Sequence, residues 1–600
     1  MGDPVPGMEL SRRLPGDRLD SWKEIAVYLN RDVTTVQRWE KREGMPVHRH
    51  VHDRVGSVYA YREELDAWVR SRKVPEPDRQ VAEPPDHAAV SPPSSSQAEM
   101  LANPARKTRI AVVAAGLASL LLLGGYFIRR SAQSASASGG RLIIGVLPLK
   151  NLSGDAGQEY FVDGLTEEVV TQLGQLNPER IGVVRCSPQP GEQQEVSAIP
   201  ELARQSGARY VLEGSVRRQD AHARISLQLI RVPDQAIIWT ESFDRSVGDV
   251  LSLQSEIAQR IGSELEVQVL GHPAPRPVNP EVVEAYLRGR FELSRHDSSD
   301  SPLSDAARIN FERAAALDRS YAPAYAGLAD FYRLKGGEKD EDSEQAWPLA
   351  AKYADQALSL DPRGADAHVA LAWIKLAHDW DWEAARNHVL RALELNPSSP
   401  EAHSVYATYL RIAGDVAEAV NQRKQALALD PSRSDLRERL ASEYFFARDY
   451  PDAVALARQA LSENPLDASQ HYGLCNGLRY MKRFDESVAE CGKVLALEGH
   501  MDWVDAYLQQ YRSHGYEAAR LLIEGKRLRL MERNPHADLW DLANAYVAVG
   551  KIGETLSILE KGIPIHDSGL LQLRVDPDFD PIRGDPRYAA LLRQINFPNN

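Results

Sequence analysis

The 600-residue sequence predicts a multidomain protein: a winged helix-turn-helix module, a single transmembrane helix, an α/β domain and an all-α solenoid of helical repeats, in that order. Three observations predict this. Residues 21–70 have the pattern of helix, turn, helix, hairpin and helix, residues 110–128 carry no charge, and Asp-Pro or Asn-Pro recurs at intervals of 34 or 35 residues. A chain of this length exceeds what one hydrophobic core can organise, so several folded units are expected.

The charge of the chain is unevenly distributed. Residues 1–108 contain 17 Lys/Arg and 17 Asp/Glu, so the net charge of −14 belongs to the remainder. An acidic C-terminal region argues against general nucleic-acid binding there. The three cysteines, Cys186, Cys475 and Cys491, form neither a disulfide framework nor a zinc motif. Cys475 and Cys491 are favoured as two small buried residues, and a bridge between them stays open if the region is extracytoplasmic.

Residues 17–73 are predicted to form a winged helix-turn-helix DNA-binding domain. Ser21 and Glu24 form a capping box at the start of the first helix, and Asp32 is placed to cap the second. Polar side chains on the second helix could reach base edges in the major groove, while arginines on the following hairpin would hold phosphates. The predicted DNA-binding residues are Thr34, Thr35, Gln37, Arg38, Lys41 and Arg42 on the helix and Arg49 and Arg54 on the hairpin.

The stretch "SWKEIAVYLNRDVTTVQRWEKREGMPVHR" together with "GSVYAYREELDAWV" resembles the MerR/excisionase-like winged helix family. This resemblance implies double-stranded DNA as a partner; the alternative is a small protein-interaction domain. Residues 17–73 contain 12 Lys/Arg and 10 Asp/Glu, so a single module should bind DNA weakly and a homodimer on paired half-sites is expected.

His48, His50 and His52 alternate on the predicted hairpin. A metal site is one interpretation of this spacing. Solvated side chains are favoured, because no carboxylate or cysteine joins the three histidines.

A linker and a membrane span are predicted to follow. Residues 74–108 are rich in Pro, Ser and Ala, which is typical of a flexible linker. Residues 109–129 are predicted to be a transmembrane helix, because 19 uncharged residues suffice to cross a hydrocarbon core of about 30 Å. Basic residues flank both ends, so charge does not set the orientation. Because DNA lies in the cytoplasm, the N-terminus is expected there, at a bacterial inner membrane, with the C-terminal region periplasmic.

Residues 141–270 are predicted to form an α/β domain, from apolar strand-like runs that alternate with amphipathic helices. The stretches "IGVLPLKNLSG", "EYFVDGLTEEVVTQL" and "ARYVLEGSVRR" resemble the TolB N-terminal-like domain. Five clustered carboxylates are candidate catalytic groups, but no nucleophile–base pair, phosphate loop or cyclase motif accompanies them. The chain is therefore expected not to be an enzyme, and no cofactor or metal is expected. The carboxylates are Asp155, Glu159, Asp163, Glu167 and Glu168.

Residues 280–565 are predicted to be tetratricopeptide (TPR) repeats. Asp361, Asn396, Asp430 and Asn464 each precede a proline, and small residues recur four positions before and eleven after them. A 34-residue period with small residues where helices cross is the TPR pattern, and such a solenoid offers a face for a protein or peptide partner. Residues 566–600 resemble the closing loop and capping helix of such proteins.

The order of these parts predicts a membrane-anchored one-component transcriptional regulator, similar to ToxR-like membrane regulators but with a different DNA-binding module. The alternative is a membrane-anchored TPR scaffold whose N-terminal module binds protein.

Overall fold

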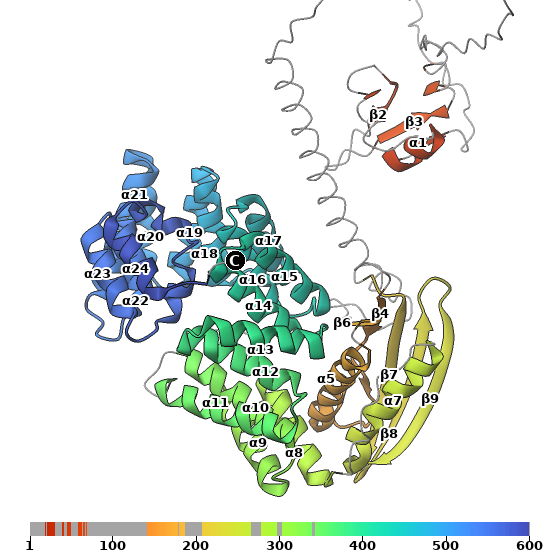
Figure 1. Ribbon diagram of the computed structural model, residues 1–600. Helices are drawn as coiled ribbons and strands as arrows, with labels where there is room; N and C mark the ends of the chain where they lie inside the picture. Colours follow the sequence, from red (N-terminus) through yellow and green to blue (C-terminus); the bar gives the residue numbers. More distant parts are fainter. Residues whose placement is uncertain are drawn as a thin grey trace, which may run out of the picture. The chain divides into compact units, whose positions relative to one another are not determined.

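The computed structural model divides into two compact units, residues 1–115 and 116–600 (Figure 1). In the N-terminal unit it describes residues 18–19, 21–29, 36, 39–40, 45–49, 58–62, 64–65 and 68. In the C-terminal unit it describes residues 141–177, 179–186, 207–265, 278–296, 303–338 and 343–598. The predicted linker and membrane span, residues 74–129, lie outside these ranges. Within them, no helix is both long and apolar enough to cross a bilayer.

The N-terminal unit contains a small antiparallel sheet beside a short helix. Its elements are β1 (Arg18–Leu19), α1 (Trp22–Tyr28), β2 (His48–Arg49) and β3 (Val58–Tyr61), with the strand order β1-β3-β2. β2 and β3 pair antiparallel, as the predicted hairpin requires. β1 was not predicted, because a strand of two residues has no periodicity that a sequence can reveal.

The core of this unit joins residues from all its predicted helices. The amide of Glu24 donates to Ser21 Oγ (3.2 Å) and the Ser21 hydroxyl donates to Glu24 Oε1 (3.4 Å), which confirms the capping box. Ile25, Val36 and Leu65 are fully buried in one cluster. The described residues of α1, the hairpin and the two later predicted helices therefore share one core, and the winged helix-turn-helix itself stays a prediction.

The C-terminal unit begins with a mixed sheet of order β6-β4-β7-β8-β9, in which β5 also pairs with β7. β4 is parallel to β6 and β7, whereas β7, β8 and β9 form an antiparallel meander. Five of these six strands overlap the strand-like runs predicted from the sequence, which are residues 142–147, 181–184, 210–217, 224–231 and 236–243. The strands are β4 (Leu142–Val146), β5 (Lys150–Asn151), β6 (Ile181–Arg185), β7 (Tyr210–Gln219), β8 (His222–Arg231) and β9 (Ala236–Ser246).

Two helices, α5 (Glu159–Leu176) and α7 (Val250–Glu264), pack on this sheet and on each other. Phe161, Leu165 and Ile261 are fully buried and belong to a core that continues into the first helices of the array. The sheet domain and the start of the array thus share one hydrophobic core. The helix predicted near residues 199–206 lies outside the described residues.

The rest of the unit is a succession of antiparallel helix pairs (Figure 1). The helices are α8 (Pro280–Ser294), α9 (Asp305–Leu317), α10 (Ala322–Gly337), α11 (Ser343–Leu360), α12 (Ala365–Ile374), α13 (Trp382–Leu395), α14 (Pro400–Ala413), α15 (Val416–Leu429), α16 (Ser434–Phe446), α17 (Tyr450–Glu463), α18 (Ala468–Tyr480), α19 (Phe484–Leu497), α20 (Met501–His514), α21 (Tyr516–Met531), α22 (Leu539–Ala548) and α23 (Ile552–Gly562).

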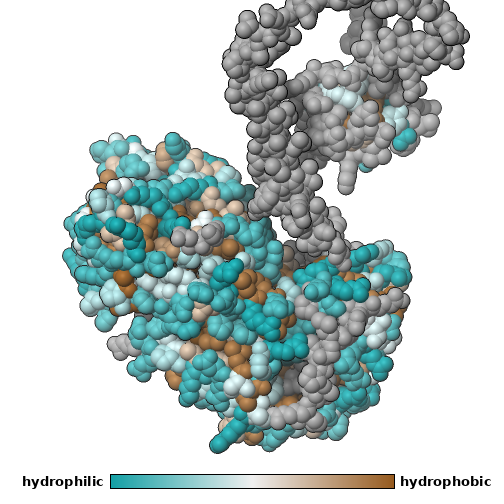
Figure 2. All heavy atoms as spheres, in the orientation of Figure 1, coloured by the Kyte–Doolittle hydropathy of each residue, from teal (hydrophilic) through white to brown (hydrophobic). Residues whose placement is uncertain are grey.

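The helix register confirms the repeat period. The first helices of four successive repeats begin at Ala365, Pro400, Ser434 and Ala468, at the spacing that the Asp/Asn-Pro pairs predict. Ala372, one of the small residues expected at a helix crossing, is fully buried. On the face shown in Figure 2, hydrophilic residues cover most of the C-terminal unit and hydrophobic patches are smaller.

The chain ends in a segment, residues 566–598, that we call the C-terminal segment. It contains two short 3₁₀ helices, η5 (Ser568–Gln572) and η6 (Pro577–Ile582), and the helix α24 (Pro586–Ile595). Asp585 caps α24 by accepting a hydrogen bond from the Arg587 amide (2.8 Å). A loop followed by a closing helix is the arrangement expected from the sequence.

Candidate functional site

Most of the predicted DNA-binding residues lie outside the described part of the N-terminal unit. Arg49 is in β2, and only its backbone is described. What the structure describes is the scaffold that would carry them: Trp39 contacts Trp68 with ring centroids 5.7 Å apart, which joins the second and third predicted helices. The residues outside the described part are Thr34, Thr35, Gln37, Arg38, Lys41, Arg42 and Arg54.

His48 holds the hairpin of this unit in place. Its Nε2 lies 2.7 Å from Glu64 Oε2, and its ring stacks on Tyr59 with centroids 5.2 Å apart. The expectation that no carboxylate joins the histidines was wrong here, because the fold brings Glu64 to the hairpin. Among the described residues, no group of three or more His, Cys, Asp or Glu side chains is placed to hold a metal ion.

The clustered carboxylates of the sheet domain serve separate structural contacts. Asp155 Oδ1 accepts from the Gly157 amide (2.8 Å), and Glu159 Oε1 accepts from Asn151 (3.0 Å). Glu167 pairs with Arg185, and Glu168 accepts from a tyrosine of the array. Asn151 also donates to the carbonyl oxygen of Asp155 (3.0 Å), so these contacts hold the loop before α5 and join the sheet domain to the array.

A polar network joins the sheet domain to α8 of the array. The Tyr160 hydroxyl donates to Glu284 Oε1 (3.0 Å) and accepts from Arg218 (2.8 Å) and Arg288 (3.2 Å). Burial raises the pKa of Tyr160, so the phenol remains a hydrogen-bond donor. Hydrogen bonds from Arg288 and Tyr160 outweigh burial and lower the pKa of Glu284. The network fixes the sheet domain against the first repeat.

A second joint lies deeper in the same interface. The Tyr286 hydroxyl donates to Glu168 Oε1 at 2.6 Å. Burial raises the pKa of Tyr286 well above 10.0, and burial also raises the pKa of Glu168. At the edge of the sheet, the Val183 amide donates to Ser398 Oγ (3.1 Å), which comes from the loop before α14. The sheet domain therefore contacts both the first and a middle repeat.

The C-terminal segment packs back on repeats that lie far earlier in the chain. His566 Nδ1 lies 2.6 Å from the carbonyl oxygen of His378, and its ring stacks on Trp380 with centroids 4.5 Å apart. Arg574 donates to the carbonyl oxygen of Ile412 at 3.2 Å. Apolar residues of the segment are buried in the same core as α12 and α14: Leu570, Leu571, Leu573, Phe579, Ile582, Leu591 and Ile595.

Acidic residues of the segment pair with basic residues of two repeats. Asp578 pairs with Arg479, and the Tyr480 hydroxyl donates to Asp578 Oδ1 at 2.5 Å. Asp580 Oδ1 accepts from Arg448 at 2.8 Å. The residues of the repeats that receive the C-terminal segment form a surface together with Arg411. We call this surface the acceptor face, because it accepts the segment; its residues are Arg411, Arg448, Arg479 and Tyr480.

Arg411 belongs to a buried charged triad. Its Nε lies 3.5 Å from Glu443 Oε1, while Arg423 Nε lies 3.3 Å from Glu443 Oε2 and Arg423 also donates to Thr408 (2.8 Å). Burial lowers the pKa of Arg423 to about 10. Nε and Nη1 of Arg411 are buried and have no hydrogen-bond partner among the described residues. Two guanidinium groups thus share one carboxylate.

Asp576 adds an unusual carboxyl group beside this face. Only 6 % of its surface is exposed, and Oδ1 accepts from the Asp578 amide at 2.9 Å. Burial, reinforced by the charge of Asp578, raises the pKa of Asp576 to about 7, against the attraction of Arg479 and Arg411.

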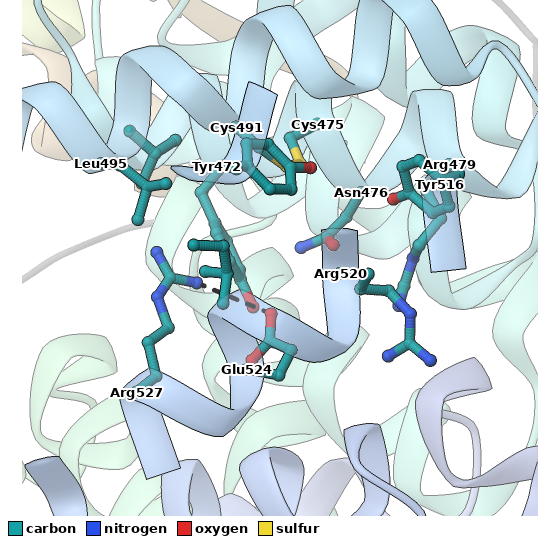
Figure 3. A pocket seen from close by; sticks show the side chains of 13 residues that line it. Tyr472, Cys475, Asn476, Arg479, Cys491, Leu495, Tyr516, Arg520, Glu524 and Arg527 are labelled. Atoms are coloured by element: carbon teal, nitrogen blue, oxygen red, sulfur yellow. Dashed lines mark ion pairs between the residues drawn. A yellow bond between two sulfur atoms is a disulfide. The ribbon is translucent and has the colours of Figure 1, made fainter. Parts of the chain in front are cut away.

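A small pocket lies next to Arg479, among α18, α19, α20 and α21 (Figure 3). Cys475 and Cys491 line it and are joined by a disulfide with a Cα–Cα distance of 5.4 Å. The expectation of two unbridged residues was wrong, because the paired helices of a repeat bring these positions within bridging distance. Arg527 pairs with Glu524 at its rim.

Sequence reasoning missed the acceptor face. Arg411 and Arg479 occupy the same repeat position two 34-residue periods apart, a signal that was present in the sequence. The partner of Arg479, Asp578, lies in "DPDFDPIRGDP", which was predicted only as a closing segment. The pairing of the two required the structure.

Comparisons with known proteins bear on the sheet domain and on the array. Residues 141–260 match the second domain of HilA/YgeH-like transcriptional regulators. The expected TolB N-terminal-like domain covers the same residues, and that resemblance stays a prediction. A Rhizobium meliloti (strain 1021) protein described as "Putative adenylate cyclase 3" is 30 % identical over 243 residues, 39 % of this chain and 40 % of that protein. The chain thus spans less than half the length of this curated relative.

Three solved structures are similar at low TM-scores. The TPR protein YrrB, described as having an unusual peptide-binding site, is 16 % identical and covers 32 % of this chain and 94 % of its own (TM-score 0.25). Pseudomonas aeruginosa PilF is 16 % identical, and the match covers 38 % of this chain and 97 % of PilF (TM-score 0.29). Yeast Tom70 is 17 % identical, and the match covers 57 % of this chain and 77 % of Tom70 (TM-score 0.30).

Proposed function

We propose that this protein is a membrane-anchored one-component transcriptional regulator. The observation that carries the proposal is the match of residues 141–260 to a domain of HilA/YgeH-like transcriptional regulators, in a chain whose N-terminal residues predict a DNA-binding module. The proposed function consists of binding and coupling, and it requires no catalytic step.

In this proposal the N-terminal unit binds double-stranded DNA as a winged helix-turn-helix. Support comes from its buried core, its capped first helix and its hairpin, which together would present the polar second helix to the major groove. Two copies are required, because the near-neutral module forms too few phosphate contacts alone.

The predicted span, residues 109–129, anchors the protein in the bacterial inner membrane with residues 131–600 in the periplasm. The disulfide between Cys475 and Cys491 supports this orientation, because disulfides persist in oxidising compartments and are rare in the cytosol. The buried state of the third cysteine, Cys186, agrees with a thiol that takes no part in exchange.

The sheet domain and the array transmit the signal together. Their shared core and the contacts of Tyr160, Tyr286 and Ser398 make them move as one body. A protein or peptide partner that binds the array therefore biases association of the outer regions, and association pairs the DNA-binding modules.

Binding of random duplex DNA to the detergent-solubilised full chain tests the proposal. We expect affinity that falls steeply with salt and that drops when Gln37, Arg38 and Lys41 are replaced by Ala, because phosphate and base contacts are lost. The matched control is Arg587→Ala, which removes an exposed arginine that pairs with Glu560 (2.8 Å) in the C-terminal unit. Absence of binding at low salt would instead favour the scaffold function.

A further inference from the structure

The acceptor face carries more positive charge than its own repeats neutralise. Arg411 and Arg423 share the single carboxylate of Glu443, and all three side chains are almost completely buried. Among the described residues, Nη1 of Arg411 and Nη1 of Arg423 have no hydrogen-bond partner, and neither has Oε1 of Glu443. Buried donors without acceptors are unfavourable, so a further carboxylate from outside the repeats would stabilise this surface.

The C-terminal segment supplies carboxylates to this face, but only in part. Asp578 pairs with Arg479 and Asp580 with Arg448, and the Arg448–Asp580 pair is more than 40 % exposed on both sides. Near Arg411 the segment places Asp576, yet Nε and Nη1 of Arg411 and Nε of Arg479 have no hydrogen-bond partner among the described residues. A ligand with better-placed carboxylates would satisfy donors that the segment leaves unmatched.

We infer that the acceptor face is a binding site for an acidic peptide segment of a partner protein, and that residues 576–580 of this chain are its built-in competitor. The inference rests on the proposed function only in that the array binds a partner; it adds the chemistry of that partner. The competing residues, Asp-Pro-Asp-Phe-Asp, define this chemistry: carboxylates at alternate positions, a proline-restricted backbone that enters the 3₁₀ helix η6, and an aromatic side chain between two of the carboxylates.

The aromatic residue belongs to the recognition pattern. Phe579 is fully buried, and its ring contacts Trp540 of α22 with centroids 4.8 Å apart. The carboxylates on either side of it reach α18 and the end of α16. An incoming segment therefore has to match both the charges and the aromatic position, which restricts the partners that displace the competitor.

The test uses the solubilised full chain and a fluorescein-labelled peptide with the sequence of residues 572–586. The variant Asp578→Asn/Asp580→Asn weakens the competitor and leaves the acceptor face intact. We expect this variant to bind the peptide at least about tenfold more tightly than the unmodified chain, and we expect Arg479→Gln in the same variant to abolish the gain. A peptide with Asn in place of Asp576, Asp578 and Asp580 should not bind.

Two controls separate this inference from other causes. Glu560→Gln removes an ion pair of similar exposure outside the acceptor face and should leave peptide affinity unchanged. If the double variant does not fold, Asp580→Asn alone replaces it in the peptide-binding measurement. This single change removes only the exposed ion pairs of Asp580 with Arg448 and Arg583. Equal peptide affinity of the unmodified and Asp-to-Asn chains, or a gain that survives Arg479→Gln, would overturn the inference. Neither result affects DNA binding, which tests the proposed function separately.

Discussion

Protonation of Asp576 is expected to stabilise the docked C-terminal segment. Burial and the neighbouring charge of Asp578 raise the pKa of Asp576 from 3.8 to about 7. The docked form therefore binds a proton more tightly than the undocked form. The stabilisation is complete below pH 3.8 and is lost as the pH rises through about 7.

The size of the effect follows from the two pKa values. Between pH 8 and pH 5 the docked carboxyl group takes up a proton while the undocked one does not, which contributes about 2.5 kcal/mol at about 1.4 kcal/mol per pKa unit. Urea unfolding at pH 5, 6, 7 and 8, followed by circular dichroism, measures this change. Asp576→Asn is the control, because its amide oxygen still accepts from the Asp578 amide and does not titrate. The reasoning is refuted if the unmodified chain and Asp576→Asn show the same pH dependence.

Three further predictions concern the packing of the C-terminal unit. A Cβ at Gly327 would lie 2.5 Å from the nearest ring atom of Phe311, so Gly327→Ala should lower the free energy of unfolding by about 1–3 kcal/mol. The control is Gly553→Ala, whose Cβ would have no atom within 4 Å and which should not lower it. Thermal melts compare the two variants. Tyr286→Phe leaves the partly buried Glu168 without its donor and should lower the free energy of unfolding by about 1–3 kcal/mol in urea titrations. An unchanged free energy would contradict the role of this hydrogen bond in joining the sheet domain to the array. Cys475→Ala opens a bridge that closes a loop of 16 residues and should cost about 3 kcal/mol in oxidising buffer but nothing under reductant.

Local and periodic features were predictable from the sequence because they arise from local physics. The starts of α12, α14, α16 and α18 agree with the predicted period, since each repeat must place small residues where its helices cross. The strands of the sheet domain agree because buried strands need apolar runs. The capping box at Ser21 is a contact over three residues, which a sequence shows directly.

Contacts between distant residues were not predictable from one sequence. Asp578 and Arg479 are 99 residues apart, and the triad of Arg411, Arg423 and Glu443 depends on how three helices pack. The disulfide was left open for the same reason: spacing alone gives no distance between two helices. The predicted DNA-binding side chains, such as Gln37 and Arg38, remain predictions, since they lie outside the described residues.

The most direct test of the proposed regulator function is genome-wide DNA occupancy of the tagged protein in its native host. The account predicts a limited set of discrete sites, which disappear when Gln37, Arg38 and Lys41 are replaced by Ala and persist in Arg587→Ala. A membrane scaffold would give no enrichment above background, or the same pattern in the unmodified chain and the triple variant. Either of those results would contradict the account.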